Sequence, residues 1–276
     1  MKLSLSVRIA EGFLSKEQPI MDLASLAKLA NAAGYDGICM RGSQVSVNSS
    51  ELQKEEAKRI LRSHGLECTM VTGDFPVVYN NDEGPQCLRN ISPYLDLAEN
   101  FNAPMIRVAL KQGDDIEWAQ RAADEAAERN LRLVHQCHTL SLFETVDSIV
   151  ETLQRINRPN FGLIYEPANL EICGQDYGVS TLERVAPWLF NVYLQNQILK
   201  PGGDVTLNTW CRGDVSFDII QVHEPGGIDY RQVFDGLHAI GYDGIVTVHQ
   251  SAPDGTTPQE SATATAGFLR ELMRRS

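Results

Sequence analysis

Short apolar runs alternate with longer amphipathic stretches along the whole chain. A parallel sheet with crossover helices produces this alternation, because its strands are buried on both faces and each helix buries one side. Eight of the runs have the length and the flanking residues of strands. We predict strands at residues 3–7, 37–40, 67–71, 105–109, 131–136, 161–166, 191–195 and 244–249.

The stretches between these runs have the spacing of helices. In residues 21–33 leucine recurs at every third position and so lies on one face, and residues 115–130 and 142–157 also carry their apolar residues at helical spacing. Residues 34–37 and 241–244 both read Gly-Tyr-Asp-Gly. Because glycine just beyond a helix is the usual left-handed terminator, both segments predict a helix that passes directly into a strand.

The alternation and the length of the chain together indicate one barrel. The 276 residues are close to the roughly 250 that a (β/α)8 barrel needs. We therefore expect an α/β protein, a single-domain (β/α)8 TIM barrel over residues 1–276. Residues 196–227 form the one long stretch without periodicity, and we predict an irregular loop there. A loop of that length in a barrel is usually a lid or a binding element, so we expect it to lie over the substrate site.

Composition and charge narrow the function further. With 36 acidic and 24 basic residues the net charge is -12, which repels nucleic-acid backbones and anionic lipids. The first residues lack the features of a signal peptide, and no apolar run is long enough for a membrane span. The six cysteines are scattered without a C-x-x-C pair and predict free thiols. We expect a cytoplasmic protein without nucleic-acid or membrane partners, and a homo-oligomer remains an open alternative.

Polar side chains end most of the predicted strands. In (β/α)8 barrels the reactive groups lie at these carboxyl ends, so the residues found there are the candidates for chemistry. Side chains alternate along a strand, which places Gln136 and His138 on one face and His135 on the other. We predict that the candidates converge on one cavity: Arg41, Arg107, Gln136, His138, Glu166, Asn169, Tyr193, Gln195 and His249.

Two segments carry a family resemblance. Residues 227–230 read Gly-Ile-Asp-Tyr and are followed by the run Gly-Tyr-Asp-Gly-Ile-Val-Thr-Val at 241–248, and residues 165–169 read Tyr-Glu-Pro-Ala-Asn. At these places the chain resembles the xylose-isomerase-like TIM-barrel superfamily of sugar isomerases, epimerases and inosose dehydratases. The resemblance covers nearly the whole chain. It implies a small sugar-like substrate and a divalent metal held by three carboxylates and a histidine.

Carried over residue by residue, the resemblance assigns a metal site at Gln136, Glu166, Gln195 and His249, with His138 matching the family's histidine after its first ligand. Three of these four positions depart from the family's carboxylate and histidine ligands. Mg²⁺ and Mn²⁺ prefer several hard carboxylate oxygens, whereas a mixed set of carboxylate, imidazole and amide also suits Zn²⁺. We therefore leave binding of Mn²⁺, Zn²⁺ or Mg²⁺ and a metal-free site as equal alternatives.

The same departures bear on the reaction. The family mechanism uses two metal-bound carboxylates for proton transfer next to a carbonyl, and here Gln136 and His249 replace them. Glutamine cannot accept a proton in this role, whereas histidine titrates near neutral pH. We therefore expect catalysis by His249, His138 and Glu166, and a one-base elimination is more compatible with these residues than a two-base epimerisation.

Each of the other polar candidates allows two interpretations, one as a substrate contact and one as a structural residue. Arg41 and Arg107 either bind a carboxylate or phosphate of the substrate or form internal ion pairs with Glu166 or Asp74. Trp210 and Arg212 either close over the substrate or anchor the loop against the barrel or a neighbouring subunit. In the same way Asn169 and Tyr193 are expected to contact the substrate, with simple barrel packing as the alternative for Tyr193. We interpret His135 as a hydrogen-bonded structural residue.

Three functions compete on this basis. The first is an isomerase, epimerase or lyase that acts on a sugar, keto-sugar or cyclitol, with an atypical divalent-metal site. The second is a metal-free sugar-binding or partner-dependent subunit derived from the same barrel. The third is an endonuclease, which needs more metal-binding histidines and acids and a basic groove than this sequence offers.

Overall fold

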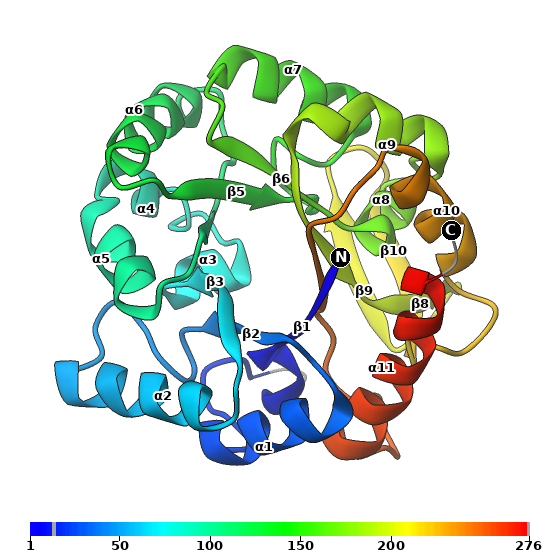
Figure 1. Ribbon diagram of the computed structural model, residues 1–276. Coiled ribbons are helices and arrows are strands. Elements are labelled where there is room, and N and C mark those ends of the chain that lie inside the picture. The colour runs from blue at the N-terminus through cyan, green and yellow to red at the C-terminus, as the bar shows by residue number, and fades with distance from the viewer. Residues whose placement is uncertain (13–14, 275–276) are drawn as a thin grey trace.

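The computed structural model describes residues 1–12 and 15–274, and its core is a closed barrel of parallel strands (Figure 1). Around the barrel the strand order is β1-β11-β7-β6-β5-β4-β3-β2. Each predicted strand overlaps one of these, which confirms the expected (β/α)8 architecture. The strands are β1 (Lys2–Ser6), β2 (Gly37–Arg41), β3 (Glu67–Thr72), β4 (Met105–Val108), β5 (Arg132–Gln136), β6 (Phe161–Tyr165), β7 (Leu189–Leu194) and β11 (Ile245–Val248).

Helices surround the barrel on its outside (Figure 1). The longer ones are α1 (Leu23–Ala33), α2 (Glu51–Ser63), α5 (Ser92–Phe101), α6 (Asp115–Glu128), α7 (Val146–Ile156), α9 (Val179–Val185), α10 (Tyr230–Ala239) and α11 (Pro258–Arg274). Short helical turns join them to the strands: η1 (Val7–Ala10), α3 (Phe75–Tyr79), α4 (Gln86–Arg89), α8 (Pro167–Ile172) and η2 (Ala186–Trp188). Gly34 ends α1 with a φ of 83°, as the Gly-Tyr-Asp-Gly motif predicts.

Two packed layers hold the barrel. The larger core lies between the strands and the surrounding helices, and it includes Leu3, Leu5 and Leu163. A smaller cluster of buried residues fills the inside of the barrel: Cys39, Met70, Met105, Val134, Ile164 and Tyr193. Because the interior is filled in this way, cavities in the described part of the barrel lie towards its two ends and not along its axis.

The expected irregular loop at 196–227 is instead largely a small antiparallel sheet, so this part of the prediction was wrong. Its strands are β8 (Asn196–Leu199), β9 (Val205–Thr209) and β10 (Gly213–Ile220), in the order β8-β10-β9. The register pairs Val205 with Phe217. These strands are only partly buried and carry many polar residues, so they lack the apolar run that marks the barrel strands. We call residues 196–220 the flap.

No helix among the described residues has the length and apolar character needed to cross a membrane. The cysteines in this part of the chain are all free thiols, as their scattered positions predict.

Candidate active site

A cavity of about 380 Å³ opens where the barrel strands end, and the flap covers it. From the flap, β9 and β10 contribute Val205, Leu207, Phe217 and Ile219 to its lining, so the expected position of this segment over the mouth is confirmed. The cavity brings together seven of the residues that the sequence singles out: Arg107, Gln136, His138, Glu166, Asn169, Gln195 and His249.

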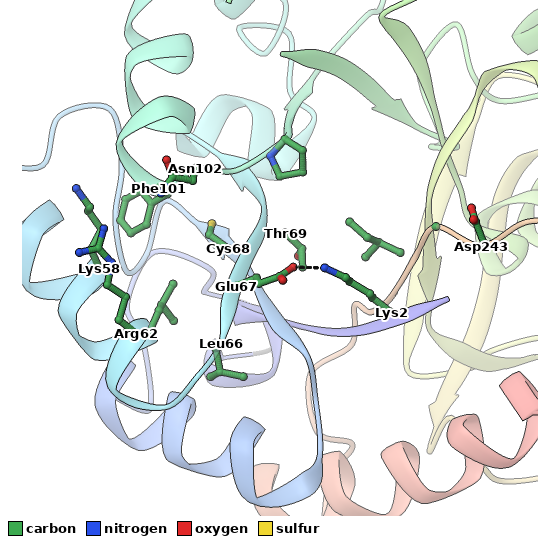
Figure 2. Close-up of a pocket in the computed structure, with 14 residues that line it drawn as sticks. Lys2, Lys58, Arg62, Leu66, Glu67, Cys68, Thr69, Phe101, Asn102 and Asp243 are labelled. Carbon is green, nitrogen blue, oxygen red and sulfur yellow. Dashed lines mark hydrogen bonds and ion pairs between the residues drawn. The ribbon is translucent and has the colours of Figure 1, made fainter. Parts of the chain in front are cut away.

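A larger cavity of about 620 Å³ lies at the opposite end of the barrel (Figure 2). It is lined by residues that precede or begin strands, among them Lys2, Glu67 and Gly244. Lys2 and Glu67 there form an ion pair of 2.6 Å with each other. Reactive groups of (β/α)8 enzymes lie at the carboxyl ends of the strands, so the smaller cavity is the candidate active site.

Glu166 is the one carboxylate among the described residues that line this cavity. It follows β6 directly, is 1% exposed, and accepts hydrogen bonds at Oε2 from the amides of Asn169, at 2.6 Å, and Gln136. Burial raises the pKa of Glu166 to about 7, although both amides and the charge of Arg107 act in the opposite direction. A carboxyl with this pKa is present in both protonation states near neutral pH and can both accept and return a proton.

His249 is fixed in the cavity wall by its neighbours. Its ring stacks on Tyr193 with centroids 4.0 Å apart, its Nδ1 lies 3.0 Å from Ser6 Oγ, and its Nε2 lies 3.4 Å from Nη1 of Arg41. Burial, with the charges of Arg41 and Arg107, lowers the pKa of His249 well below its ordinary value. The ring is therefore neutral, and both of its nitrogens already have protein partners.

His138 lines the cavity beyond β5. Its Nδ1 lies 2.9 Å from the carbonyl oxygen of Thr139, which needs a proton on that nitrogen, and 3.1 Å from Nδ2 of Asn80, which needs a lone pair there. Burial and the charge of Arg107 lower the pKa of His138 to about 3, so this ring is also neutral. His135 lies on the other face of β5, where its Nδ1 bonds to the Val108 carbonyl and its ring packs against Phe143.

Arg107 on β4 is a buried cation without a counter-ion in contact. It is 2% exposed, and its Nε and Nη1 have no hydrogen-bond partner within the described part of the chain. The side chain also lines the cavity. Burying a guanidinium without a counter-ion costs several kcal/mol of desolvation free energy, about as much as removing one partner from a buried ion pair.

Arg41 on β2 was expected in the same cavity but lies outside its lining, and it differs from Arg107 in its partners. It pairs with Glu11, with Nε 2.9 Å from Oε1 and Nη2 2.9 Å from Oε2. The expected alternatives for its partner were Glu166 or Asp74, and the structure corrects both. Asp74 instead caps α3 by accepting from the Val77 amide.

The structure adds two cations that the sequence reasoning missed, Arg8 and Lys16, and both line the cavity. Burial lowers the pKa of Lys16 to about 7 and that of Arg8 to about 10. Arg8 directly follows the first predicted strand, so the rule that found the other strand-end residues could have found it. Lys16 lies in a segment without periodicity and left no such signal.

Three further sequence candidates lie outside the cavity lining. Tyr193 belongs to the packed interior of the barrel, with its hydroxyl 3.3 Å from Cys39 Sγ. Trp210 and Arg212 lie at the tip of the flap, where the Trp210 amide donates to Glu144 and Arg212 donates to the Ile172 carbonyl. At the flap tip the contacts match the alternative in which these two residues anchor the loop against the barrel.

The four family metal positions do not present a ligand set that fits a divalent cation. Gln136 turns its amide N–H towards Glu166, Nε2 of His249 faces the Arg41 guanidinium, and the unpaired Arg107 lies in the same cavity. A divalent ion needs several oxygen or nitrogen lone pairs directed at one point, with anionic ligands to offset its charge. The cations here supply positive charge where the family places a metal.

Comparison with known proteins agrees with the architecture. An inosose dehydratase of Geobacillus thermodenitrificans is 24% identical over 158 residues, which are 56% of this chain and 53% of that protein, so the match spans about half of the relative's length. A probable 3-DHS dehydratase from Bacillus anthracis superposes with a TM-score of 0.73 at 17% identity, covering 98% of this chain and 99% of that one.

Two further solved structures share the fold. The D-allulose 3-epimerase from Methylomonas sp., in complex with D-allulose, has a TM-score of 0.71 at 14% identity and covers 98% of this chain and 96% of its own. A protein from Mycobacterium smegmatis in complex with magnesium has a TM-score of 0.70 at 15% identity, covering 99% and 97%. Residues 27–272 match the family model described as xylose isomerase-like TIM barrel, and the chain therefore belongs to that family.

Proposed function

We propose that the protein is a lyase that removes water from a polyhydroxy ketone carrying a carboxylate group. Glu166 is the group that moves the proton, and Arg107 is the group that binds negative charge. The observation that carries the proposal is the unpaired, buried guanidinium of Arg107 in the same cavity as a carboxyl whose pKa is about 7.

The charge of the cavity supports an anionic substrate. Among the described lining residues the basic side chains are Arg8, Lys16 and Arg107 and the one carboxylate is Glu166, although the whole chain carries a net charge of -12. Arg8 also lies 3.8 Å from Glu11, and a pKa of about 7 leaves Lys16 partly charged at neutral pH, so Arg107 is the main cation of the cavity. A substrate carboxylate can accept two parallel hydrogen bonds from a guanidinium, and one of the two would come from a nitrogen of Arg107 that has no protein partner among the described residues.

The single titrating carboxyl supports elimination. As a carboxylate Glu166 would accept the proton from the carbon next to the ketone, the electron pair would form a carbon–carbon double bond, and the neighbouring hydroxyl would leave with the proton that Glu166 returns. The products are one water and an unsaturated ketone. Epimerisation by the family route needs two carboxylate bases on opposite faces of the substrate, and the two family positions for them hold Gln136 and His249.

In this scheme the histidines form hydrogen bonds and do not transfer the proton. His249 was the base expected from the sequence, but its two nitrogens face Ser6 and Arg41, so we assign it to the cavity wall as a neutral hydrogen-bonding group. His138 Nε2 can form a hydrogen bond with a substrate hydroxyl, which serves either as donor or as acceptor. The unpartnered Oε1 of buried Gln136 can accept another.

The dehydratase names of two similar proteins, one for inosose and one for 3-DHS, agree with elimination. No step of this scheme passes through a metal ion, because the residues present do not fit one.

The test is a matched pair of ketones. Purified protein is incubated with 3-DHS, which carries a carboxylate, and with an inosose, which is neutral, and loss of one water is followed by mass spectrometry. We expect dehydration of the acid and at least about 100-fold less of it in Glu166→Gln, as for removal of a general acid–base group. Glu171→Gln, on the helix that begins directly after Glu166 but outside the cavity lining, is the control and should stay active.

Two outcomes contradict the proposal. Tight binding of the acid without any turnover favours the metal-free sugar-binding subunit. Formation of an epimer or isomer without loss of water favours the other enzymatic alternative of this family.

A further inference from the structure

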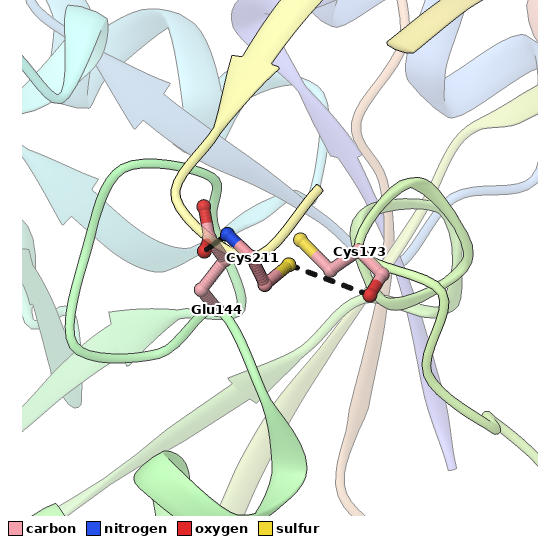
Figure 3. Close-up of side chains that lie close together, drawn as sticks. All are labelled: Glu144, Cys173 and Cys211. Carbon is pink, nitrogen blue, oxygen red and sulfur yellow. Dashed lines mark hydrogen bonds between the residues drawn. The ribbon is translucent and has the colours of Figure 1, made fainter. Parts of the chain in front are cut away.

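The tip of the flap brings two cysteines together at the edge of the barrel mouth (Figure 3). Cys211 lies in the turn between β9 and β10, and Cys173 follows the last residue of α8. The two sulfur atoms and a carboxylate oxygen of Glu144 all lie within 4.8 Å of one another. The Cys211 thiol donates to the carbonyl oxygen of Cys173 at 3.5 Å.

Backbone contacts hold this arrangement in place. Glu144 accepts from the amides of Trp210 and Cys211, each at 2.9 Å, and from the amide of Leu140 at 2.9 Å. Arg212 donates to the Ile172 carbonyl at 3.1 Å, next to Cys173. The thiols therefore meet because the flap tip is docked on two sides.

The three side chains are a poor metal site despite their proximity. Both oxygens of Glu144 already accept backbone N–H groups, two at Oε1 and one at Oε2, so a metal ion would compete with these partners for the carboxylate. Burial and neighbouring acidic groups raise the pKa of both thiols, with Glu144 among the causes for each. Metal ligation requires thiolates, which this environment disfavours.

The same features suit a disulfide. Cys211 is exposed and accessible to a reagent, whereas Cys173 is buried beside it. A disulfide is easily reduced when its surroundings stabilise the thiolates of the reduced form. The raised pKa of both thiols means that this environment does not stabilise the thiolates.

We propose that Cys173 and Cys211 form a reversible disulfide by exchange with a low-molecular-weight disulfide such as glutathione disulfide. The Cys211 thiolate attacks one sulfur of that reagent and releases one glutathione. Cys173 then attacks the Cys211 sulfur of the mixed disulfide and releases the second. Two protein thiols are oxidised, one glutathione disulfide is reduced, and the two thiol protons end on the two glutathiones. The inference does not depend on the proposed reaction.

The bond would tie the flap to α8, the helix that begins directly after Glu166. Phe217 and Ile219 of the same flap line the cavity, so a tie at the tip restrains the cover of the candidate active site. Oxidation should therefore slow flap opening, and reduction should restore it.

The experiment uses the full chain, reduced and then incubated in glutathione buffers of graded composition, in mildly alkaline solution because the thiol pKa values are raised. Digestion without reductant, followed by mass spectrometry, should find the peptides of Cys173 and Cys211 linked, with two fewer free thiols per chain. Hydrogen exchange of β9 and β10 should slow by at least about threefold on oxidation.

Single variants separate the two steps. Cys173→Ser should keep glutathione on Cys211, since no second thiol resolves the mixed disulfide, whereas Cys211→Ser should leave Cys173 unmodified. Cys68→Ser, which removes a buried cysteine on β3, should form the link as the unaltered protein does, and thermal melting confirms that each variant is folded.

Two results overturn the inference. One is a stable mixed disulfide on Cys211 in the unaltered protein, which means that Cys173 cannot reach it. The other is stoichiometric binding of added Zn²⁺ by the reduced protein that Cys173→Ser abolishes, which identifies a metal site instead.

Discussion

Arg41 and Glu11 form a two-pronged ion pair beneath the mouth of the barrel, with both nitrogen–oxygen distances at 2.9 Å. Ser43 donates a further hydrogen bond to the same carboxylate at 2.7 Å. Arg107 is as deeply buried but has no such partner within the described chain. Of these two strand-end arginines, the first is therefore neutralised by the fold and the second is left to bind something that enters the cavity.

Removal of each guanidinium should change stability in different ways. Arg41→Gln leaves Glu11 buried without its partner and should lower the free energy of unfolding by about 3–5 kcal/mol. Arg107→Gln removes a buried charge that has no partner and should leave the free energy of unfolding unchanged or raise it. Urea unfolding of both variants measures this. A large loss of stability in Arg107→Gln would show that this arginine has a structural partner.

The same variant tests the substrate class. Arg107→Gln should lower kcat/KM for a carboxylate-bearing ketone by at least about 100-fold, since charge-assisted hydrogen bonds to a buried partner are strong. A neutral ketone of similar shape should lose little by comparison. If the variant weakens both ketones equally, Arg107 recognises a feature that they share, and the proposed carboxylate is wrong although dehydration itself can stand.

Glu166 should make stability depend on pH. Its pKa is about 7 in the folded protein and near 4.5 when unfolded, so the folded form holds a proton that the unfolded form has lost between these values. The contribution of Glu166 to the free energy of unfolding is fully present below about pH 4.5, falls as the pH rises to about 7, and is constant above. The change is on the order of 3 kcal/mol.

Comparison of Glu166→Gln with the unaltered protein isolates this contribution, because the variant should lose that part of the pH dependence. Unfolding by urea at several pH values measures it, with Glu171→Gln as the control. Activity should rise with a midpoint near pH 7, where the carboxylate of Glu166 forms in the folded protein. A pH dependence of stability that is identical in Glu166→Gln would place the pKa of Glu166 close to its ordinary value.

Metal removal should have no effect. Because the Arg41 guanidinium faces Nε2 of His249, the Gln136 amide donates to Glu166 and Arg107 lines the same cavity, we expect the purified protein to contain no stoichiometric Mg²⁺, Mn²⁺ or Zn²⁺. Treatment with a chelator should leave both Tm and turnover unchanged. Metal analysis by mass spectrometry checks this, and restoration of activity by one added ion after chelation would contradict it.

Glu144 should anchor the flap. Glu144→Gln replaces an acceptor of three backbone N–H groups by a side chain that carries its own N–H donors, and should cost about 1–3 kcal/mol. The flap should then exchange hydrogen faster and be cut sooner by protease than the barrel strands. Glu151→Gln on α7 is the control, since the Glu151 side chain is 71% exposed. Equal protection of the flap in both variants would show that other contacts hold it.

The sequence by itself determined the barrel and much of its mouth. Apolar runs separated by helical spacing define strands and helices locally, and alternation along a strand assigns each side chain to a face. Gln136, Glu166 and His249 could therefore be placed in one cavity before any contact was known, and they do line it together. The flap sheet escaped this reasoning, because its partly exposed strands carry a mixed polar pattern and are paired only through their hydrogen bonds.

Only the tertiary structure decided the charges and partners inside that cavity. Glu11 pairs with Arg41, Arg41 lies beside His249, and Arg107 has no counter-ion in contact among the described residues, because closure of the barrel brings segments together that are far apart in sequence. Burial, which the same closure sets, then moves the pKa of Glu166 upward and that of His249 downward. Local pattern fixes which residues face the mouth, whereas the desolvation and pairing that determine their chemistry arise from contacts across the whole fold.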